Sequence, residues 1–118
     1  AAKKLFGNAL ILSLSAAMAD VLTLAKACDV PGQDAIKMME LLDLNMMVAT
    51  RGANMARGDF PPSFELAMAR KDVSLMLETA GARPLALLHG IAARMDQLLT
   101  AGHGADDVSV LAIDAVQR

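Results

Sequence analysis

The sequence contains few aromatic residues and a single cysteine. It has three Phe, no Trp, no Tyr, and Cys28 as its only thiol. A lone thiol cannot form an internal disulfide, which argues against a secreted, disulfide-stabilised scaffold. No His/Cys grouping has the spacing of metal ligands, so we expect no metal site. These absences predict a protein of the reducing cytoplasm.

The sequence also lacks a concentration of positive charge. Eleven Lys and Arg residues stand against 13 Asp and Glu residues, for a formal net charge of -2. No basic stripe is interleaved with aromatic residues, so neither phosphate attraction nor base stacking has an obvious source. We therefore expect no nucleic-acid partner.

What the sequence does contain is aliphatic and flexible. Hydrophobic residues make up 55% of the 118 positions, and nine of them are Met. Ala, Leu and Met favour helix packing over sheets, and the length fits one domain without room for a separate cofactor domain. We predict an all-α helical bundle, residues 1–118, with an apolar excess that is buried against another chain or domain.

Turn and cap signals divide the sequence into helices. Asp29-Val30-Pro31-Gly32, Asp59-Phe60-Pro61-Pro62 and Gly81 are breaks, and Asn45 can cap a helix that follows it. Apolar spacing then predicts helices at about 4–28, 33–42, 46–57, 64–80 and 84–101, with a short last helix to about 116 that Asp106-Asp107 cap. The first is apolar on nearly every side, as a buried central helix would be.

The N-terminal segment imitates a secretory signal. Lys3-Lys4 precede an apolar run from Leu5 to Leu14 and the small residues Ala17-Met18-Ala19. Asn8 interrupts that run, however, and the helical pattern continues past Asp20. The stretch from Lys4 to Asp20 is also shorter than the ~20 apolar residues that a bilayer requires. We interpret the segment as a helix of the domain and expect no membrane partner.

Few residues offer chemistry by pattern alone. Lys4 and Asn8 lie one helical turn apart on the first predicted helix, and burial there would lower the pKa of an amine enough for proton exchange. The alternative is a solvated lysine at a frayed terminus. His89 and His103 have no evident partner in the sequence, so we interpret them as a helix-surface residue and a loop residue.

Four motifs in a fixed order carry a resemblance to a known family. They are Lys4-Leu5-Phe6-Gly7-Asn8, Asp59-Phe60-Pro61-Pro62-Ser63-Phe64, Lys71-Asp72-Val73-Ser74-Leu75, and Gly102-His103-Gly104 with Asp107-Val108-Ser109. Together they resemble the C-terminal domain of the 3-hydroxyisobutyrate dehydrogenase family, the β-hydroxyacid dehydrogenases, which has the all-α fold of the 6-phosphogluconate dehydrogenase C-terminal domain. The resemblance covers nearly the whole chain.

The resemblance implies a role for individual residues. Lys4 would be the catalytic general acid/base beside the carbonyl of a small hydroxy acid or semialdehyde, and Asn8 would bind that substrate. Lys71 would approach the NAD or NADP cofactor. Asp72 would lie at the edge of the substrate pocket, with Phe64 as its apolar wall. The alternatives are a surface charge pair for Lys71 and Asp72, a core anchor for Phe64, and a buried amide for Asn8.

The sequence departs from the family pattern in two places. The glycine-rich stretch that the family places before the catalytic Lys is absent, and Gly7-Asn8 replaces the usual Asn pair. The Rossmann nucleotide-binding domain with its Gly-x-Gly-x-x-Gly motif is also absent, so we interpret the chain as the C-terminal half of the enzyme, inactive by itself. The family's helical domain supplies most of the subunit interface, which implies a homodimer or homotetramer.

Other functions remain as alternatives. Within the same family, the substrate could instead be tartronate semialdehyde, succinic semialdehyde or glyoxylate. Outside it, the chain could be a non-catalytic helical oligomerisation module. Joint retention of Lys4, Asn8 and Lys71 favours the enzyme.

Overall fold

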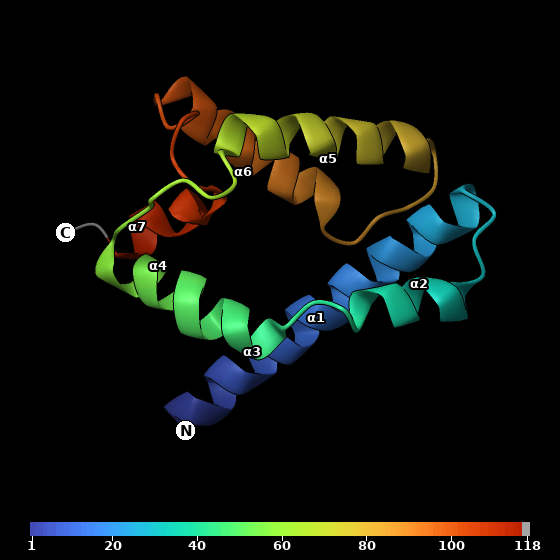
Figure 1. Ribbon diagram of the computed structural model, residues 1–118, viewed down its shortest axis with the longest axis horizontal. Coiled ribbons are helices and arrows are strands. Elements are labelled where there is room, and N and C mark those ends of the chain that lie inside the picture. The colour runs from blue at the N-terminus through green and yellow to red at the C-terminus, as the bar shows by residue number, and fades with distance from the viewer. Residues whose placement is uncertain (117–118) are drawn as a thin grey trace. The chain divides into compact units, whose positions relative to one another are not determined.

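The computed structural model describes residues 1–116, and these residues form helices, with no strand among them. The helices are α1 (Ala2–Ala27), α2 (Gly32–Met39), α3 (Leu44–Met47), the π-helix η1 (Val48–Gly52), α4 (Ala53–Arg57), α5 (Leu66–Ala80), α6 (Leu88–Thr100), the 3-10 helix η2 (Val108–Ala112) and α7 (Ile113–Val116) (Figure 1). The prediction of an all-α domain with a long N-terminal helix is confirmed.

The chain divides into two compact units. The first comprises Ala1–Leu41 and Met76–His89, and the second comprises Leu42–Leu75 and Gly90–Arg118. In the first unit α1 packs against α2. In the second, α4 packs against α7 and η2. The most completely buried large side chains, Leu66 and Val110, both belong to the second unit.

A buried carboxylate organises the first unit. Asp20, on α1, is 3% exposed and accepts hydrogen bonds from the backbone N–H groups of Ala86, Leu87 and Leu88 at 2.6, 2.9 and 2.9 Å. These are N–H groups at the start of α6 that have no partner within the helix. An acceptor distant in sequence therefore caps α6.

This cap moves the start of α6 relative to the sequence prediction. The predicted start near Pro84 is wrong, because the helix begins at Leu88, where Asp20 supplies the acceptor. Two local predictions also fail. Asp43 rather than Asn45 caps α3, accepting from the N–H of Met46. The second helix, α2, ends at Met39 rather than near residue 42, and Leu42 is 60% exposed.

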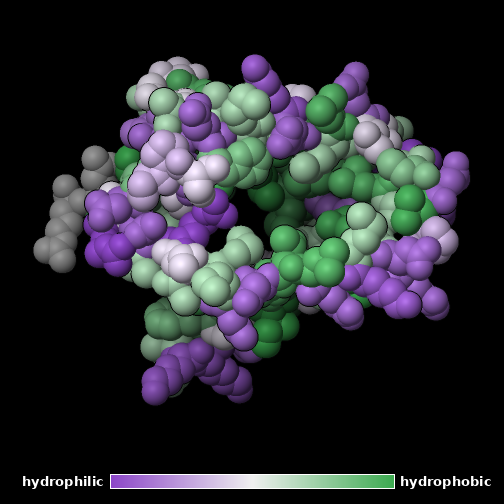
Figure 2. All heavy atoms as spheres, viewed as in Figure 1, coloured by the Kyte–Doolittle hydropathy of each residue, from purple (hydrophilic) through white to green (hydrophobic). Residues whose placement is uncertain are grey.

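The long helix α1 is largely uncovered in this chain. Of its residues only Asp20 and Ala25 are buried. Figure 2 shows hydrophobic residues at the surface next to the hydrophilic N-terminal end of the helix. The expectation that this helix is buried is therefore wrong for the chain alone. The large apolar side chains left exposed in its first half are Leu5, Phe6, Leu10, Ile11 and Leu12.

By length and composition, α1 could cross a membrane. The expectation that the apolar stretch is too short does not hold for the complete helix, which has 26 residues. A core helix of a soluble protein and a signal sequence pass the same test, so length and composition do not distinguish them.

Candidate functional site

Lys4 and Asn8 lie where the sequence predicts them, on the first turns of α1. The helix is regular from Ala2 to Ala27, which places both side chains on one face, one turn apart. Both residues are exposed. The burial expected for Lys4 is thus not provided by the described residues.

Phe64, Lys71 and Asp72 belong to the second unit. Phe64 lies just before α5 and is 39% exposed, so it is not the core anchor considered above. Lys71 and Asp72 are exposed on α5, and no ion pair joins them within residues 1–116. All three side chains are therefore accessible to a ligand or to another domain.

A polar cluster in the second unit centres on Asp107, which the sequence analysis named as a helix cap and as part of a family motif, without a functional role. It does cap η2, accepting from the N–H of Ser109 at 2.9 Å through Oδ2. Its Oδ1 also accepts from the backbone N–H groups of Ser63 (3.1 Å) and Phe64 (3.0 Å), and from the Ser63 hydroxyl (3.2 Å). The residue is 3% exposed.

These donors hold Asp107 ionised. Burial alone would raise the pKa of its carboxyl group, because desolvation disfavours the charged form. Hydrogen bonds from Ser109, Phe64 and Ser63 outweigh that effect and lower the pKa well below its ordinary value. Asp107 is therefore a permanent anion at physiological pH and not a proton donor.

Arg51 reaches the same carboxylate from the π-helix η1. Its Nε lies 3.1 Å from Asp107 Oδ2, and its Nη2 donates to the Ser63 hydroxyl at 3.1 Å. A π-turn contains more residues per hydrogen-bonded ring than an α-turn, and such turns are frequent at functional sites. No sequence signal distinguishes Arg51, since its partners come from 12 and 56 positions away.

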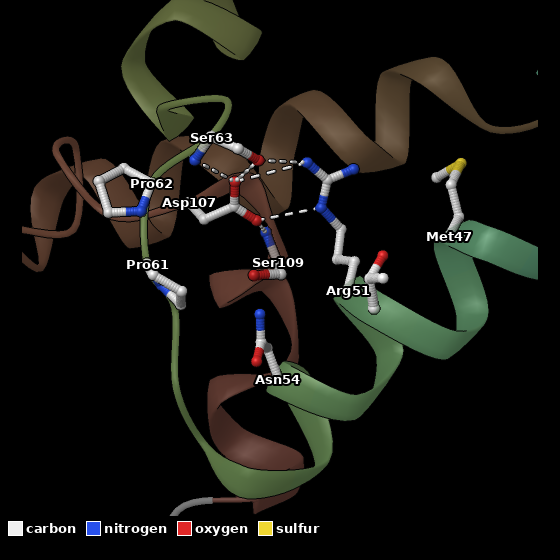
Figure 3. Close-up of a pocket in the computed structure, with 9 residues that line it drawn as sticks. Met47, Arg51, Asn54, Pro61, Pro62, Ser63, Asp107 and Ser109 are labelled. Carbon is white, nitrogen blue, oxygen red and sulfur yellow. Dashed lines mark hydrogen bonds and ion pairs between the residues drawn. The ribbon is translucent and has the colours of Figure 1, made fainter.

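A cavity of about 430 Å³ lies beside this cluster. Figure 3 shows Arg51 and Ser63 directed at Asp107, with Asn54 and Ser109 facing one another below them. The other lining residues are Met47, Thr50, Pro61 and Pro62. The cavity is polar on the side of Asp107 and apolar on the side of the two prolines.

His103 has a partner that the sequence reading missed. Its Nδ1 lies 2.8 Å from Asp106 Oδ2, three residues on, and both residues line a second cavity of about 350 Å³. The backbone of this loop has a structural function as well, because the carbonyls of Gly104 and Asp106 accept from the first N–H groups of α5. His89 is exposed on α6, as expected for a helix-surface residue.

No metal centre can be built from residues 1–116, because they contain no group of three or more His, Cys, Asp or Glu side chains suitable as ligands. The described residues also offer few groups that could bind a dinucleotide. The chain has no glycine-rich phosphate loop, and Lys71 is the exposed cation to which the family resemblance assigns a cofactor contact.

The fold defines a class of protein, an all-helical domain with a long N-terminal helix. The chain belongs to the family described as NAD-binding of NADP-dependent 3-hydroxyisobutyrate dehydrogenase, whose family model matches residues 1–113. The match spans both compact units. No curated protein matches the chain.

Proposed function

We propose that this domain supplies the general acid/base and part of the substrate pocket of an NAD(P)-dependent β-hydroxyacid dehydrogenase. The substrate is a small β-hydroxy acid or its semialdehyde. An N-terminal Rossmann domain of the full-length protein holds most of the NAD or NADP. The family match over residues 1–113 carries the proposal, and the exposed Lys4–Asn8 pair on α1 supports it.

Each of the proposed site residues has a separate role in the reaction. Lys4 Nζ gives a proton to the substrate carbonyl oxygen during reduction and takes it back during oxidation. Asn8, one turn along, donates to the substrate and orients it beside that amine. The dinucleotide, when bound, supplies or accepts the hydride. Phe64 and Asp72 border the substrate, and Lys71 contacts the cofactor.

The exposed Lys4 side chain must be shielded from solvent before it can act efficiently. Covering α1 with the Rossmann domain or a second subunit would remove Lys4 from solvent and place it beside the substrate. The apolar surface around it supports such a cover. We therefore include assembly as a homodimer or homotetramer, and a cytoplasmic location with neither membrane nor nucleic acid as partner, in the proposal.

The test is turnover by the full-length protein with Lys4 intact and as Lys4→Ala. Substrates are 3-hydroxyisobutyrate, tartronate semialdehyde, succinic semialdehyde and glyoxylate, with NAD(H) and NADP(H). We expect kcat to fall at least ~100-fold, the scale of a lost general acid/base. Lys3→Ala, which removes the neighbouring exposed amine, is the matched control and leaves kcat unchanged.

The second candidate is a non-catalytic oligomerisation module, favoured by the exposed apolar side chains of α1. An intact protein that assembles and binds dinucleotide, yet turns over none of the four substrates, would support it. Activity on one of the semialdehydes or on glyoxylate alone would instead select the alternative reductases of the same family.

A further inference from the structure

Two segments distant in sequence are joined through their backbones around Phe64. Residues 60–67 lie against residues 104–109, and Glu65 and Asp107 form an isolated antiparallel bridge. The N–H of Val108 donates to the carbonyl of Phe64 at 2.8 Å. The remaining backbone hydrogen bonds run from Asp107 to Phe60 (3.1 Å), from Leu66 to Asp106 (2.9 Å) and from Ala67 to Gly104 (3.0 Å).

The Asp107 side chain adds a contact to Phe64. Its Oδ1 accepts the N–H of Phe64 at 3.0 Å, while Val108 occupies the carbonyl of the same residue. Both backbone polar groups of Phe64 are thus fixed by the 107–108 segment. Charged acceptors form stronger hydrogen bonds than neutral ones, so the carboxylate is the firmer of the two restraints.

Phe64 is less buried than the first residue of α5. It is 39% exposed, in contrast to Leu66, two positions on, which is fully buried. Core packing therefore fixes the start of α5 but not the ring that precedes it. The Phe64 backbone that carries the ring is held by the Asp107 carboxylate and by the hydrogen bond from Val108.

We propose that Asp107 is a positioning residue that sets substrate discrimination, by holding the backbone of Phe64 so that its ring stands as a fixed wall of the substrate pocket. The inference rests on the proposed function, because it takes Phe64 as that wall. Asp107 itself does not touch the substrate, since its carboxylate oxygens are engaged by Ser63, Phe64, Ser109 and Arg51.

The cluster offers a matched control within itself. Arg51 binds Asp107 through Nε at Oδ2, and it has no hydrogen bond to Phe64. Arg51→Met therefore removes one partner of the buried carboxylate while the Phe64 contact stays. Asp107→Ala removes both. Asp107→Asn is a third variant, because it keeps an amide oxygen that can still accept from Phe64 if the Ala variant fails to fold.

The experiment compares kcat/KM of the full-length protein for 3-hydroxypropionate and 3-hydroxyisobutyrate, which differ by one methyl group. A pocket wall discriminates such a pair by roughly 10- to 200-fold. We expect Asp107→Ala to change the ratio by about tenfold or more through KM, and Arg51→Met to preserve it. Asp107→Asn should fall between them. A merely structural lesion would lower the active fraction and so leave the ratio unmoved.

Amide hydrogen exchange on the same proteins distinguishes failure of the positioning proposal from failure of the proposed function. If the parent turns over neither these two acids nor tartronate semialdehyde, succinic semialdehyde or glyoxylate, the proposed function fails, and exchange alone decides the positioning. Faster exchange of residues 63–67 in Asp107→Ala, but not in Arg51→Met, supports it. An unchanged discrimination ratio in an active Asp107→Ala variant, or unchanged exchange of those amides in either case, overturns it.

Discussion

Asp20 and Asp107 are the aspartates that the fold buries within residues 1–116, and both accept hydrogen bonds from backbone N–H groups. Burial would raise the pKa of Asp20, but the N–H groups of Ala86, Leu87 and Leu88 outweigh it and lower that pKa. An unpaired charge in such a place would be unfavourable. The carboxylate is instead stabilised by the positive end of α6.

This arrangement predicts an acid-sensitive contribution from Asp20. Asp20→Asn should lower the free energy of unfolding at pH 7 by about 1–3 kcal/mol, because a hydrogen bond to a charged acceptor is lost. The folded-state pKa lies below the unfolded value of about 3.9, so the contribution is present above that value and lost as the pH falls through the folded-state pKa. The difference between parent and variant should shrink accordingly in urea unfolding at pH 7, 5 and 3.

Asp59→Asn is the control for that measurement. Asp59 pairs with Arg57 at 3.6 Å, but its side chain is 66% exposed, and such pairs contribute little. A stability difference for Asp20→Asn that is the same at pH 3 as at pH 7 would contradict the assignment of Asp20 as an ionised cap.

Residue roles were the part of the site least accessible from sequence. Lys4, Asn8, Phe64, Lys71 and Asp72 came from a resemblance, and their roles stay predictions. The Arg51–Asp107–Ser63 cluster could not be predicted, because its members come from separate segments and no local periodicity relates them. Ser63 and Asp107 belong to two of the family motifs, and Asp106-Asp107 also form a capping pattern, but neither signal indicates that the two segments meet.

At the scale of elements, the helices were predicted and several of their ends were not. Local patterns identified every α-helical region because apolar spacing, Gly and Pro act within a few residues. The start of α6 failed because its acceptor, Asp20, is more than 60 positions away. The π-helix η1 within the segment 44–57 also left no sequence signal.

Helix glycines provide an element-scale prediction. A Cβ at Gly7 in α1, or at Gly90 in α6, would meet nothing within 4 Å. Gly7→Ala and Gly90→Ala should therefore each raise the free energy of unfolding of the 118-residue chain by roughly 0.5–1 kcal/mol, since Gly costs more backbone entropy than Ala. Thermal unfolding followed by circular dichroism measures both.

The effects of the two substitutions on stability should differ in the assembled full-length protein. If another domain or subunit approaches α1 closely, Gly7→Ala loses its advantage there while Gly90→Ala keeps it. Destabilisation by Gly7→Ala in the 118-residue chain would show that the end of α1 is not open as described.

At the scale of the whole molecule, the exposed side of α1 is the dominant feature. Ile11 is 61% exposed and Leu12 is 70% exposed, on a helix that carries the proposed catalytic residue. A contiguous apolar surface of this kind marks an interaction site in soluble proteins. The sequence predicted both a buried central helix and an apolar excess buried against another chain or domain. The first prediction is wrong for this chain alone, because apolar content does not show which molecule supplies the contact.

Ile11→Asp tests that surface in the full-length protein. Burying an Ile side chain contributes about 1.5–3 kcal/mol, so its loss should weaken self-association at least about tenfold. Sedimentation velocity across a concentration series measures the shift. Lys26→Asp, an exposed change at the opposite end of α1, should leave association intact. If the oligomer of Ile11→Asp is as stable as that of the parent, the Rossmann domain rather than a second subunit would be the element that contacts this surface.

The π-helix between α3 and α4 has one more consequence. Its wider turn accommodates a residue that a regular helix would not, while α3 and α4 continue on either side of it. A one-residue deletion in an ordinary helix rotates everything beyond it by about 100°. Here the same deletion would relax the bulge to regular winding, so the chain could be shortened with the helix unbroken. A side chain other than Arg51 would then face Asp107.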